Sequence, residues 1–521
     1  MDHFSRKHAD DVMGALSGFD RIRFRGTQRW LANVRGMMGF LWRVQVKLKE
    51  FKAYSMKLTG EIRSTVASLA ADAGRPVEYL NHPGVSKEVR ARQIARTDGI
   101  TEGLICVLES VDPCFSYEVG PNRQSKQLEL RRKLMKCKHH YLYFVHPQLG
   151  FGHLRLQPWF PFTMHVCING REWLCRELDR AGVGYVRRDN CLVAVEDVPR
   201  APQLLWRQAQ ADWQTLFGQL TGWAFPAHRT LLCGEPLDYD WSADETEWAT
   251  DVMFRSSERL DRLYPQLLRH GMQTFSSAEV LRFLGRRTTA SGAVHRNFAG
   301  EVLSDLRRRP EGIRIKHRLN RNSIKMYNKQ GSVLRVETTM TDTRDIKVYR
   351  RVEGEPDSEK AWRRLRKGVS DLPRRAEVSE AANLRYLNAL AAADETTSLE
   401  ELAARLCRPI VWQGRRVRGL RPLEAEDRAL LQATMRGEFA IHGFRNRDLR
   451  SILFPPTTDS ITQRRQAANI TRRLRLLRAH GLVKKVPTTH RYVLTRHGQT
   501  TITAFLSALR ADTNKLNELA A

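Results

Sequence analysis

The 521 residues of this chain exceed what one hydrophobic core usually organises, and two to four domains are expected. Lys and Arg number 87 against 57 Asp and Glu, a formal net charge of +30, which predicts a polyanionic partner, either DNA or structured RNA. No run of 18 apolar residues occurs, and the opening MDHFSRKHADDVMGAL lacks the pattern of a signal peptide, so the sequence argues against a membrane protein and favours the cytoplasm.

The eight cysteines favour the same compartment. None of them forms a CxxC pair, which argues against a zinc ribbon and against a disulfide framework. Most of them are expected to be buried thiols in a reducing environment.

Residues 1–225 are predicted to form an α+β domain with an antiparallel sheet. A helix-like opening leads into a short strand at SGFDRIRFRG, and residues 37–75 have the pattern of an amphipathic helix. Closely spaced strand candidates follow, with turn residues between them. They are PVEYL (76–80), LICVLESV (104–111), CFSYEV (114–119), QLELRRK (127–133), HHYLYFVH (139–146), FGHLRLQ (151–157), TMHVCING (163–170) and, after a helix REWLCRELDRAG that ends at Gly182, NCLVAVED (190–197).

Residues 226–375 are predicted to form a mixed domain with a basic hairpin. The stretch DETEWATD is interpreted as helical, and the helices ERLDRLYPQLLRHGM and AEVLRFLG follow it. Residues 281–350 then carry 17 basic and 6 acidic side chains. Residues 351–375 resemble a linker or an exposed helix, and residues 376–435 a helical connector.

Residues 436–521 have the order helix, helix, hairpin, helix. The segments are GFRNRDLRSILF, ITQRRQAANITRRLRLLRAHGL with Gly481 closing it, VKKVPTTHRYVLTRHG and TITAFLSALRADTNKL. This order is that of a winged helix-turn-helix, and it resembles the winged domains of MarR-like regulators. A winged domain that serves protein contacts or RNA is the alternative.

The resemblance implies that the Arg-rich helix lies in the major groove and that the wing contacts phosphate or the minor groove. Residues 441–521 hold 15 basic and 4 acidic side chains, which suits that role. The residues expected to bind nucleic acid here are Arg464, Arg465, Arg472, Arg473, Lys484, Lys485, His490 and Arg491.

Carboxylates in three places are candidate catalytic residues. Asp20 lies in the first strand, Asp112 follows the apolar strand LICVLESV, and Asp244, Glu247 and Asp251 share one face if DETEWATD is helical. The pattern is similar to the ribonuclease-H-like arrangement of transposases and resolvases, which implies a nuclease with Mg²⁺ held by Asp20, Glu247 and Asp251. A solvated helix N-terminus, where acids are favoured, explains DETE as well.

Five histidines fall within 27 residues. They are His139, His140, His146, His153 and His165. None forms a His-x-His pair, and ordinary sheet histidines are favoured, although His165 and Cys167 share a strand face and suit a metal.

The hairpin NSIKMYNKQGSVLRVETT (322–339) resembles the Tyr-x-Lys and Arg-x-Glu strand pair of rolling-circle replication initiators at Tyr327, Lys329, Arg335 and Glu337. The resemblance implies a tyrosine nucleophile and a catalytic role for Glu337, but the histidine pair of those enzymes is missing. Two alternatives are a charge-paired sheet face, with Glu337 beside a lysine, and a nucleic-acid grip by Lys325, Tyr327 and Lys329.

Over most of its length the chain also resembles a widespread family of bacterial proteins of mobile-element type. The segments FDRIRFRG, GLICVLESVDP, FGHLRLQPWFPF, NGREWL, EWATDVMF and KMYNKQGSVLRVETT carry this resemblance. We expect a nucleic-acid-binding protein that is a metal-dependent nuclease, transposase or replication initiator. The alternative is a non-catalytic winged-helix regulator or a protein scaffold for a structured noncoding RNA. The sequence leaves open a homodimer and an RNA guide.

Overall fold

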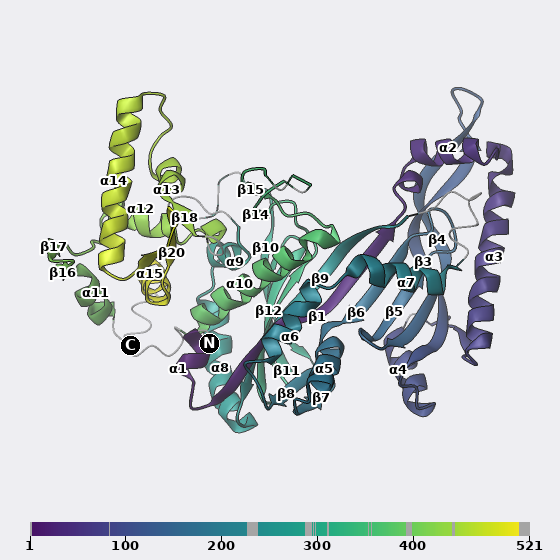
Figure 1. The fold of residues 1–521 in the computed structure, drawn as a ribbon, viewed down its shortest axis with the longest axis horizontal. Helices are drawn as coiled ribbons and strands as arrows, with labels where there is room; N and C mark the ends of the chain where they lie inside the picture. Colours follow the sequence, from purple (N-terminus) through teal and green to yellow (C-terminus); the bar gives the residue numbers. More distant parts are fainter. Residues whose placement is uncertain are drawn as a thin grey trace.

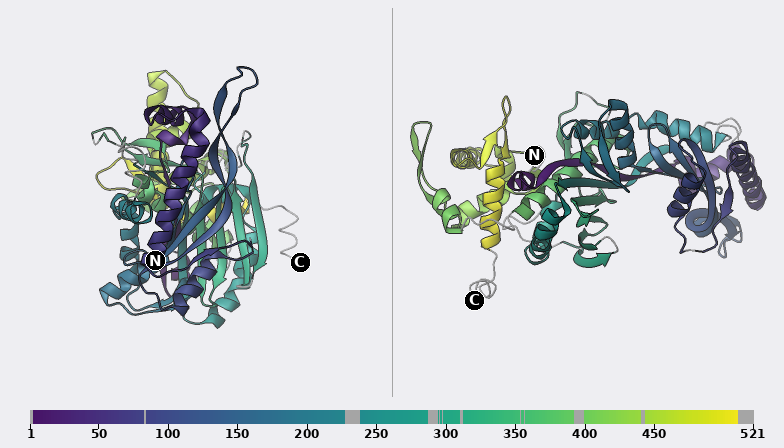
Figure 2. Two further views of the ribbon diagram at one scale, coloured as in Figure 1. Left: turned by 90° about the vertical axis from the view of Figure 1, so that its right-hand side faces the viewer. Right: turned by 90° about the horizontal axis from the view of Figure 1, so that it is seen from below.

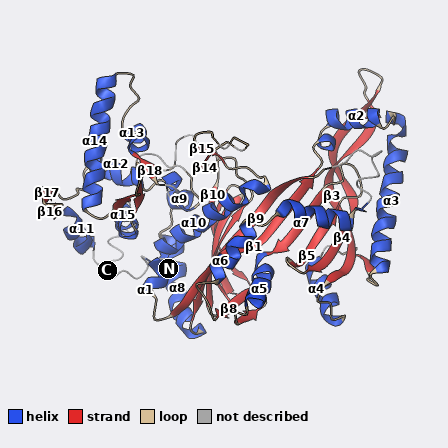
Figure 3. Ribbon diagram, in the orientation of Figure 1, coloured by secondary structure: helices blue, strands red, loops and turns tan. Residues whose placement is uncertain are grey.

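The computed structural model describes residues 3–82, 84–226, 238–286, 294, 296, 298–309, 312–352, 354–355, 357–391, 399–439 and 443–509. The molecule is elongated, with α3 (Phe51–Asp72) at one end of its long axis and α14 (Ser460–Ala479) at the other (Figure 1). One large sheet runs between these ends (Figure 3). No helix within the described residues is long and apolar enough to cross a membrane.

The large sheet has eleven strands in the order β10-β11-β12-β13-β9-β1-β6-β5-β4-β3-β2. All neighbouring pairs are antiparallel except β2 with β3, which confirms the predicted α+β class and antiparallel sheet. The strands are β1 (Val12–Thr27), β2 (Val77–Tyr79), β3 (Gly103–Pro121), β4 (Leu128–His146), β5 (Gly150–Leu156), β6 (Met164–Asn169), β9 (Asp240–Phe254), β10 (Val302–Arg309), β11 (Gly312–Leu319), β12 (Asn322–Lys329) and β13 (Val333–Met340).

The central pair, β1 and β9, joins residues more than 210 positions apart, so the sheet is continuous across residue 225. Three register shifts interrupt this pair, and two of them involve candidate carboxylates. On β1, Asp20 has no partner in the register, because its neighbours Phe19 and Arg21 pair with the consecutive residues Trp248 and Glu247. On β9, Asp244 has no partner, because its neighbours pair with the consecutive residues Arg23 and Phe24. Bulges redirect side chains, and each of these two bulges contains one of the candidate carboxylates.

One face of the sheet, which we call the apolar face, is covered by α2, α3, α7, α8, α9 and α10. On the opposite face, α4 packs against Ile105 and Phe151. Phe19, Ile22 and Phe24 of β1 pack there with α2, α3 and α7, because they alternate with charged residues that point the other way. Val336 of β13 and Ile324 of β12 pack with α8, α9 and α10 on the same face. Besides α3, the α-helices before residue 399 are α1 (His3–Lys7), α2 (Val34–Arg43), α4 (Lys87–Thr97), α5 (Gly170–Ala181), α6 (Ala201–Ala209), α7 (Trp213–Ala224), α8 (Ser257–Gln273), α9 (Ser277–Phe283) and α10 (Leu372–Leu390) among the described residues.

The opposite face, which we call the polar face, carries charges in cross-strand register. Arg23 lies opposite Glu245, Glu337 opposite Lys325, and Lys325 opposite Lys316. The short hairpin of β7 (Tyr185–Arg188) and β8 (Cys191–Val195) packs with α5 and α6 over the end of β1, where Leu16 is buried. Figure 2 shows the sheet and its helices from two further sides.

A C-terminal unit, residues 399–509, has its own core around Phe444, Ile470, Leu474 and Leu477. Its strands are ordered β18-β20-β19, and Gly481 ends α14 with a φ of +68°. The elements are α11 (Leu399–Cys407), β16 (Ile410–Trp412), β17 (Arg415–Val417), α12 (Ala425–Thr434), β18 (Phe444–Arg445), α13 (Asn446–Leu453), α14, β19 (Val483–Lys485), β20 (Arg491–Leu494) and α15 (Arg496–Ala508). Residues 510–516 of the predicted last helix lie outside the described residues.

Three sequence-based predictions of secondary structure are wrong. DETEWATD is not helical but lies in β9, because Trp248, Thr250 and Val252 alternate toward the apolar face. The helix-like opening is limited to α1, and β1 begins at Val12. The segment 351–375 contributes β15 (Ala361–Arg364), which pairs with β14 (Lys347–Arg350), and the first turn of α10.

Candidate functional site

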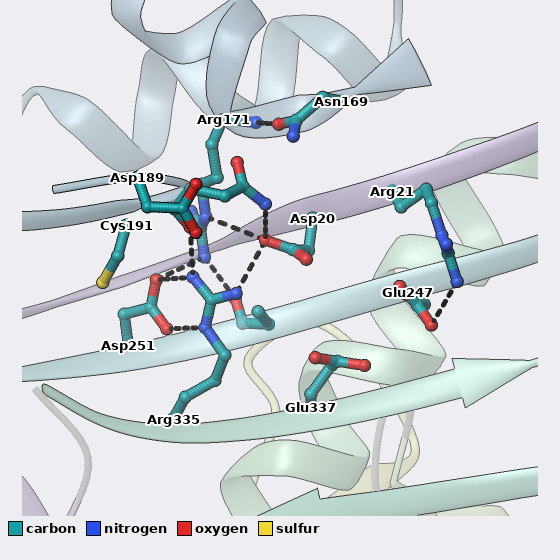
Figure 4. A network of polar contacts seen from close by, with 12 residues as sticks. Asp20, Arg21, Asn169, Arg171, Asp189, Cys191, Glu247, Asp251, Arg335 and Glu337 are labelled. Atoms are coloured by element: carbon teal, nitrogen blue, oxygen red, sulfur yellow. Dashed lines mark hydrogen bonds and ion pairs between the residues drawn. The ribbon is translucent and has the colours of Figure 1, made fainter. Parts of the chain in front are cut away.

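Two arginines and two aspartates form a buried network where β1, β9, β13 and α5 meet (Figure 4). Arg335 binds Asp251 through both carboxylate oxygens, Nε–Oδ1 at 2.5 Å and Nη2–Oδ2 at 2.8 Å. Its Nη1 donates to Asp20 Oδ1 at 2.8 Å. Arg171 of α5 reaches Asp251 Oδ2 at 2.8 Å, and its Nε lies 3.8 Å from Asp20 Oδ1.

The network is electrically balanced, with two guanidinium and two carboxylate groups. Burial alone raises the pKa of the Asp251 carboxyl, but Arg171 and Arg335 outweigh burial and hold that pKa below its ordinary value. Asn190 of the β7–β8 turn joins the network, because its side-chain amide donates to Asp20 and its carbonyl accepts from Arg335. The network therefore anchors this turn and α5 to the sheet.

The proposed Mg²⁺ ligands Asp20, Glu247 and Asp251 do not fit a magnesium ion. Both oxygens of Asp251 and one oxygen of Asp20 accept hydrogen bonds from arginine, so guanidinium groups already neutralise the carboxylates that a cation would need. Glu247 is held by Arg21 at 2.9 Å. Among the described residues, no group of three or more His, Cys, Asp or Glu is placed to hold a metal ion.

The other candidate carboxylates are dispersed. Asp244 binds Arg25 at 2.5 Å beside its bulge, and Asp112 accepts from Ser110 and Tyr141 far along β3. The predicted shared helix face of Asp244, Glu247 and Asp251 is wrong, since the segment is a strand and Asp244 is a bulge residue. The structure therefore does not assemble these carboxylates into one centre.

The hairpin of β12 and β13 carries a second cluster, around Glu337. Lys325 Nζ lies 2.6 Å from one oxygen of Glu337, and the Tyr327 hydroxyl donates to the other at 2.8 Å. The predicted contact between Glu337 and a lysine is thereby confirmed. Lys325 Nζ is also 3.6 Å from Glu247.

Protonation states in this cluster follow from burial and charge. Burial raises the pKa of Glu337, but Lys325 outweighs it and lowers that pKa to about 2, so the carboxylate is ionised. Burial and then the Glu337 charge raise the pKa of the Tyr327 hydroxyl well above its usual range. Burial, with Glu337 next, raises the pKa of Glu247. A protonated tyrosine that donates to a carboxylate is a poor nucleophile, and Arg335, the third member of the Tyr-x-Lys and Arg-x-Glu pattern, belongs to the buried network.

Two cavities open on the polar face, and each is lined by one residue of the β7–β8 turn. The larger, about 360 Å³, is lined by Asp189, Arg314, Lys329 and their neighbours, and the smaller, about 280 Å³, by Asn190, Arg21, His153 and others. Tyr327 lines both cavities. Tyr327 could be singled out from the sequence, but the contribution of the β7–β8 turn could not, because only the fold brings residues 189 and 190 to the cavities that Tyr327 lines.

The clustered histidines are sheet residues with structural contacts. His139 bonds the Cys137 carbonyl at 2.9 Å and Arg155 at 3.1 Å. Burial lowers the pKa values of His139 and His140 to about 4 and that of His153 to about 3, so these side chains are neutral. His165 and Cys167 do share the polar face, opposite Arg25 and Arg23.

The second helix of the C-terminal unit, α14, exposes a stripe of arginines. Its sequence contains six arginines and no acidic residue. Arg464, Arg465, Arg472 and Arg475 are exposed, at spacings of one, seven and three that keep them on one side of the helix. Lys484, Lys485 and His490, in β19 and the turn before β20, are exposed too.

Two of the residues predicted to bind there are engaged within the protein. Arg473 pairs with Glu426 at 3.1 Å and lies over the Phe454 ring. Arg491 lies 4.4 Å over the Tyr349 ring and donates to the Gly443 carbonyl. Their positive charges are thus partly used in packing.

The sequence analysis missed a basic arm. Strands β3 and β4 pair with each other beyond the ends of β2 and β5, and we call residues 111–139 the β3–β4 arm. It carries seven Lys and Arg against three acids. Phe115 and Leu134 on the arm are more than half exposed. In the sequence, the charge of the run NRQSKQLELRRKLMKCK indicates this arm, but the strand pattern there is that of ordinary strands.

Comparison of the chain with protein-family models, curated proteins and solved structures finds no match.

Proposed function

We propose that this protein binds nucleic acid in the cytoplasm, and that its C-terminal unit is a winged helix-turn-helix that contacts a duplex. The element order α12, β18, α13, α14, β19, β20 and the strand order β18-β20-β19 support the assignment of the fold. In it, α14 is the recognition helix and the turn between Lys485 and Arg491 is the wing. The seven described cysteines, all free thiols, suit a reducing compartment.

The acid-free stripe of α14 is the observation that carries this proposal. Four exposed arginines on a 20-residue helix would repel one another without an anionic partner, and phosphates supply that partner. Ala468 and Thr471 are exposed on the same stripe, and such small side chains let the helix approach base edges closely. Duplex DNA is the substrate that this geometry favours, because its major groove admits a helix whereas that of RNA is too narrow.

A non-catalytic binder is favoured over a metal-dependent nuclease. The carboxylates needed for Mg²⁺ are bound by arginines or dispersed along the sheet, as described above. The mobile-element resemblance fits a binder that recognises an element's DNA or RNA. A scaffold for a structured noncoding RNA is the second candidate, and the cationic β3–β4 arm at the far end of the molecule favours it (Figure 1).

Capture of the bound nucleic acid tests the proposal. The tagged protein is purified from its host after cross-linking. One portion of the retained nucleic acid is treated with DNase and another with RNase, and both are then sequenced. We expect a DNA fraction that falls at least about tenfold when Arg464, Arg465 and Arg472 are all replaced by Gln. A dominant RNA fraction that is insensitive to that change would favour the scaffold, and no enrichment would contradict both.

Incubation with labelled DNA and RNA, with and without Mg²⁺, tests catalysis separately. The proposal predicts intact substrate in every reaction. Magnesium-dependent cleavage that is lost in Glu337→Gln would restore the nuclease hypothesis.

A further inference from the structure

The edge strands β10 and β11 of the large sheet carry several cations and a single acid, Asp305, which lies opposite Lys316. Arg314, Lys316 and Arg318 alternate along β11 and so share the polar face, opposite Tyr327, Lys325 and Ser323 of β12. Among the described residues these three cations make no ion pair, and the buried Nε of Arg314 has no hydrogen-bond partner. Arg307, which pairs with Asp305 at 3.4 Å, and Arg309 of β10 extend the positive charge to the sheet edge.

The rest of the polar face is different. Further along the sheet, Lys325 is paired with Glu337, Arg21 with Glu247, and Arg25 with Asp244. Burial and the neighbouring Lys325, Arg318 and Arg314 lower the pKa of Lys316, as expected where positive charge is in excess. The unbalanced charge is therefore concentrated on β10 and β11, beside the two cavities.

Tyr327 connects this charge to the cavities. Its hydroxyl donates to Glu337, and the residue forms part of the wall of both cavities. Asp189 of the β7–β8 turn lines the larger cavity and Asn190 the smaller. Arg309, Arg314 and Lys329 line the larger cavity on the cationic side. Asn169, Asn190 and Glu88 in the smaller cavity offer amide and carboxylate groups.

We propose that β10–β12 and the β7–β8 turn form a second nucleic-acid site, which takes a single strand with its phosphates on Arg314, Lys316 and Arg318 and an unstacked base beside Tyr327. The choice of nucleic acid among polyanions rests on the function proposed above. A cationic track with an aromatic side chain is how single-strand binders combine backbone attraction with base stacking. The amide and carboxylate groups of the smaller cavity can bond to base edges.

A single strand fits this site and a duplex does not. The cavities are lined in part by the β7–β8 turn and have volumes of about 360 and 280 Å³, so only a base that has left its stack can enter. A duplex keeps its bases stacked inside a stiff rod. The strand would thus occupy the sheet while a duplex occupies α14, at a separate part of the molecule (Figure 1).

Charge-matched variants of the full chain test the second site. The sheet variant carries Arg314→Gln, Lys316→Gln and Arg318→Gln, and the α14 variant carries Arg464→Gln, Arg465→Gln and Arg472→Gln. The control variant carries Lys52→Gln, Lys57→Gln and Arg63→Gln, three exposed positions on α3. Binding of labelled oligo-uridine, oligo-thymidine and a DNA duplex is measured by anisotropy, after thermal unfolding has shown that each variant is folded.

We expect the sheet variant to lose about tenfold or more in affinity for single strands and less than about twofold for the duplex. The α14 variant should show the reverse pattern. The control variant should keep the wild-type affinity for both single strands and the duplex. Comparison of the two oligonucleotides identifies the preferred sugar. Unchanged single-strand affinity in the sheet variant overturns the second site and leaves the proposed function intact, whereas unchanged duplex affinity in the α14 variant overturns the proposed function.

Cross-linking gives a readout that does not depend on the stability of a variant. A single strand that carries a photoreactive halogenated pyrimidine is irradiated on the wild-type protein, and the linked peptide is identified by mass spectrometry. The site predicts a cross-link at Tyr327 that excess unlabelled single strand removes. Cross-links confined to other peptides would contradict the placement of the base.

Discussion

Arg335 is a fully buried charge at the centre of the arginine–aspartate network (Figure 4). Its guanidinium is fully buried, yet it is bonded to two carboxylates and a carbonyl, so most of the cost of removing it from water is offset locally. Asp251, with Arg171 on its other side, depends on the same contacts. Removal of any member leaves an uncompensated buried charge, which is far more costly than the loss of an exposed pair.

Arg335→Ala is therefore expected to lower the free energy of unfolding by about 3–5 kcal/mol. The matched control is Arg344→Ala, which removes an arginine that is 78% exposed and paired with Asp342. Urea unfolding of both variants measures the difference. Equal losses in the two variants would show that the buried network does not stabilise the fold.

His317 predicts a loss of stability in mild acid. It is buried between Ser304 and Tyr386, and burial lowers its pKa from 6.5 to about 4. The folded protein therefore binds this proton more weakly than the unfolded chain does. The stability that His317 contributes is present above pH 6.5 and is lost as the pH falls toward 4, by about 3 kcal/mol.

His317→Gln should reduce that pH dependence. Unfolding free energies of the wild type and the variant are compared at pH 7 and pH 4.5. The other neutral histidines, such as His139 and His140, leave part of the slope in place. An identical slope in both proteins would contradict the assigned protonation state.

At the residue level, sequence reasoning could find pairs that lie close along a hairpin. Glu337 and Lys325 follow from strand alternation across one turn, and the contact is present. Arg171 could not be found, since nothing in NGREWL distinguishes a buried arginine from the exposed ones. Its partners, Asp20 and Asp251, are 151 and 80 positions away, and only the complete sheet brings them together.

At the scale of elements, the position of α5 against β1 determines where Arg171 lies. Asn169 caps the helix by accepting from the Arg171 and Glu172 amides, and Gly170 places the helix start against the Phe19 carbonyl. A Cβ atom at Gly170 would stand 1.9 Å from that oxygen. The helix can approach the strand this closely only because residue 170 has no side chain.

Gly170→Ala should therefore destabilise the protein by about 2–3 kcal/mol, through displacement of α5 from the sheet. Gly218→Ala, on the exposed side of α7 with no atom near the added methyl group, should be neutral or stabilising by up to about 1 kcal/mol. Thermal and urea unfolding of the two variants give the comparison. If Gly170→Ala left the free energy of unfolding unchanged, that result would contradict the close contact between α5 and β1.

Elements with simple periodicity were predictable from the sequence, and central strands with charges were not. Gly182 and Gly481 mark the ends of α5 and α14 as expected, and most of the predicted strands exist. β9 was mistaken for a helix because its acids fall three and four residues apart, which also suits one helix face. Each acid is neutralised by a cation on a neighbouring strand, and such pairing cannot be read from one segment.

At the scale of the whole molecule, positive charge is distributed over three places. They are α14 with the β19–β20 turn, the edge strands β10 and β11, and the β3–β4 arm, which lie along the long axis of the molecule (Figures 1 and 2). The net charge predicted a polyanionic partner, but its division among separate surfaces depends on pairings such as β1 with β9. An extended nucleic acid with both paired and unpaired segments would match this distribution.

The salt dependence of duplex binding tests the proposed function most directly. Affinity of the wild type, the α14 variant and the α3 control variant for a labelled DNA duplex is measured over a range of salt concentrations. We predict that the logarithm of the wild-type affinity falls steeply with the logarithm of salt, and that the slope of the α14 variant is smaller by about 2–3, close to one per lost phosphate contact. The control should retain the wild-type slope. Equal slopes and equal affinities in all three proteins would contradict the proposal that α14 contacts the duplex.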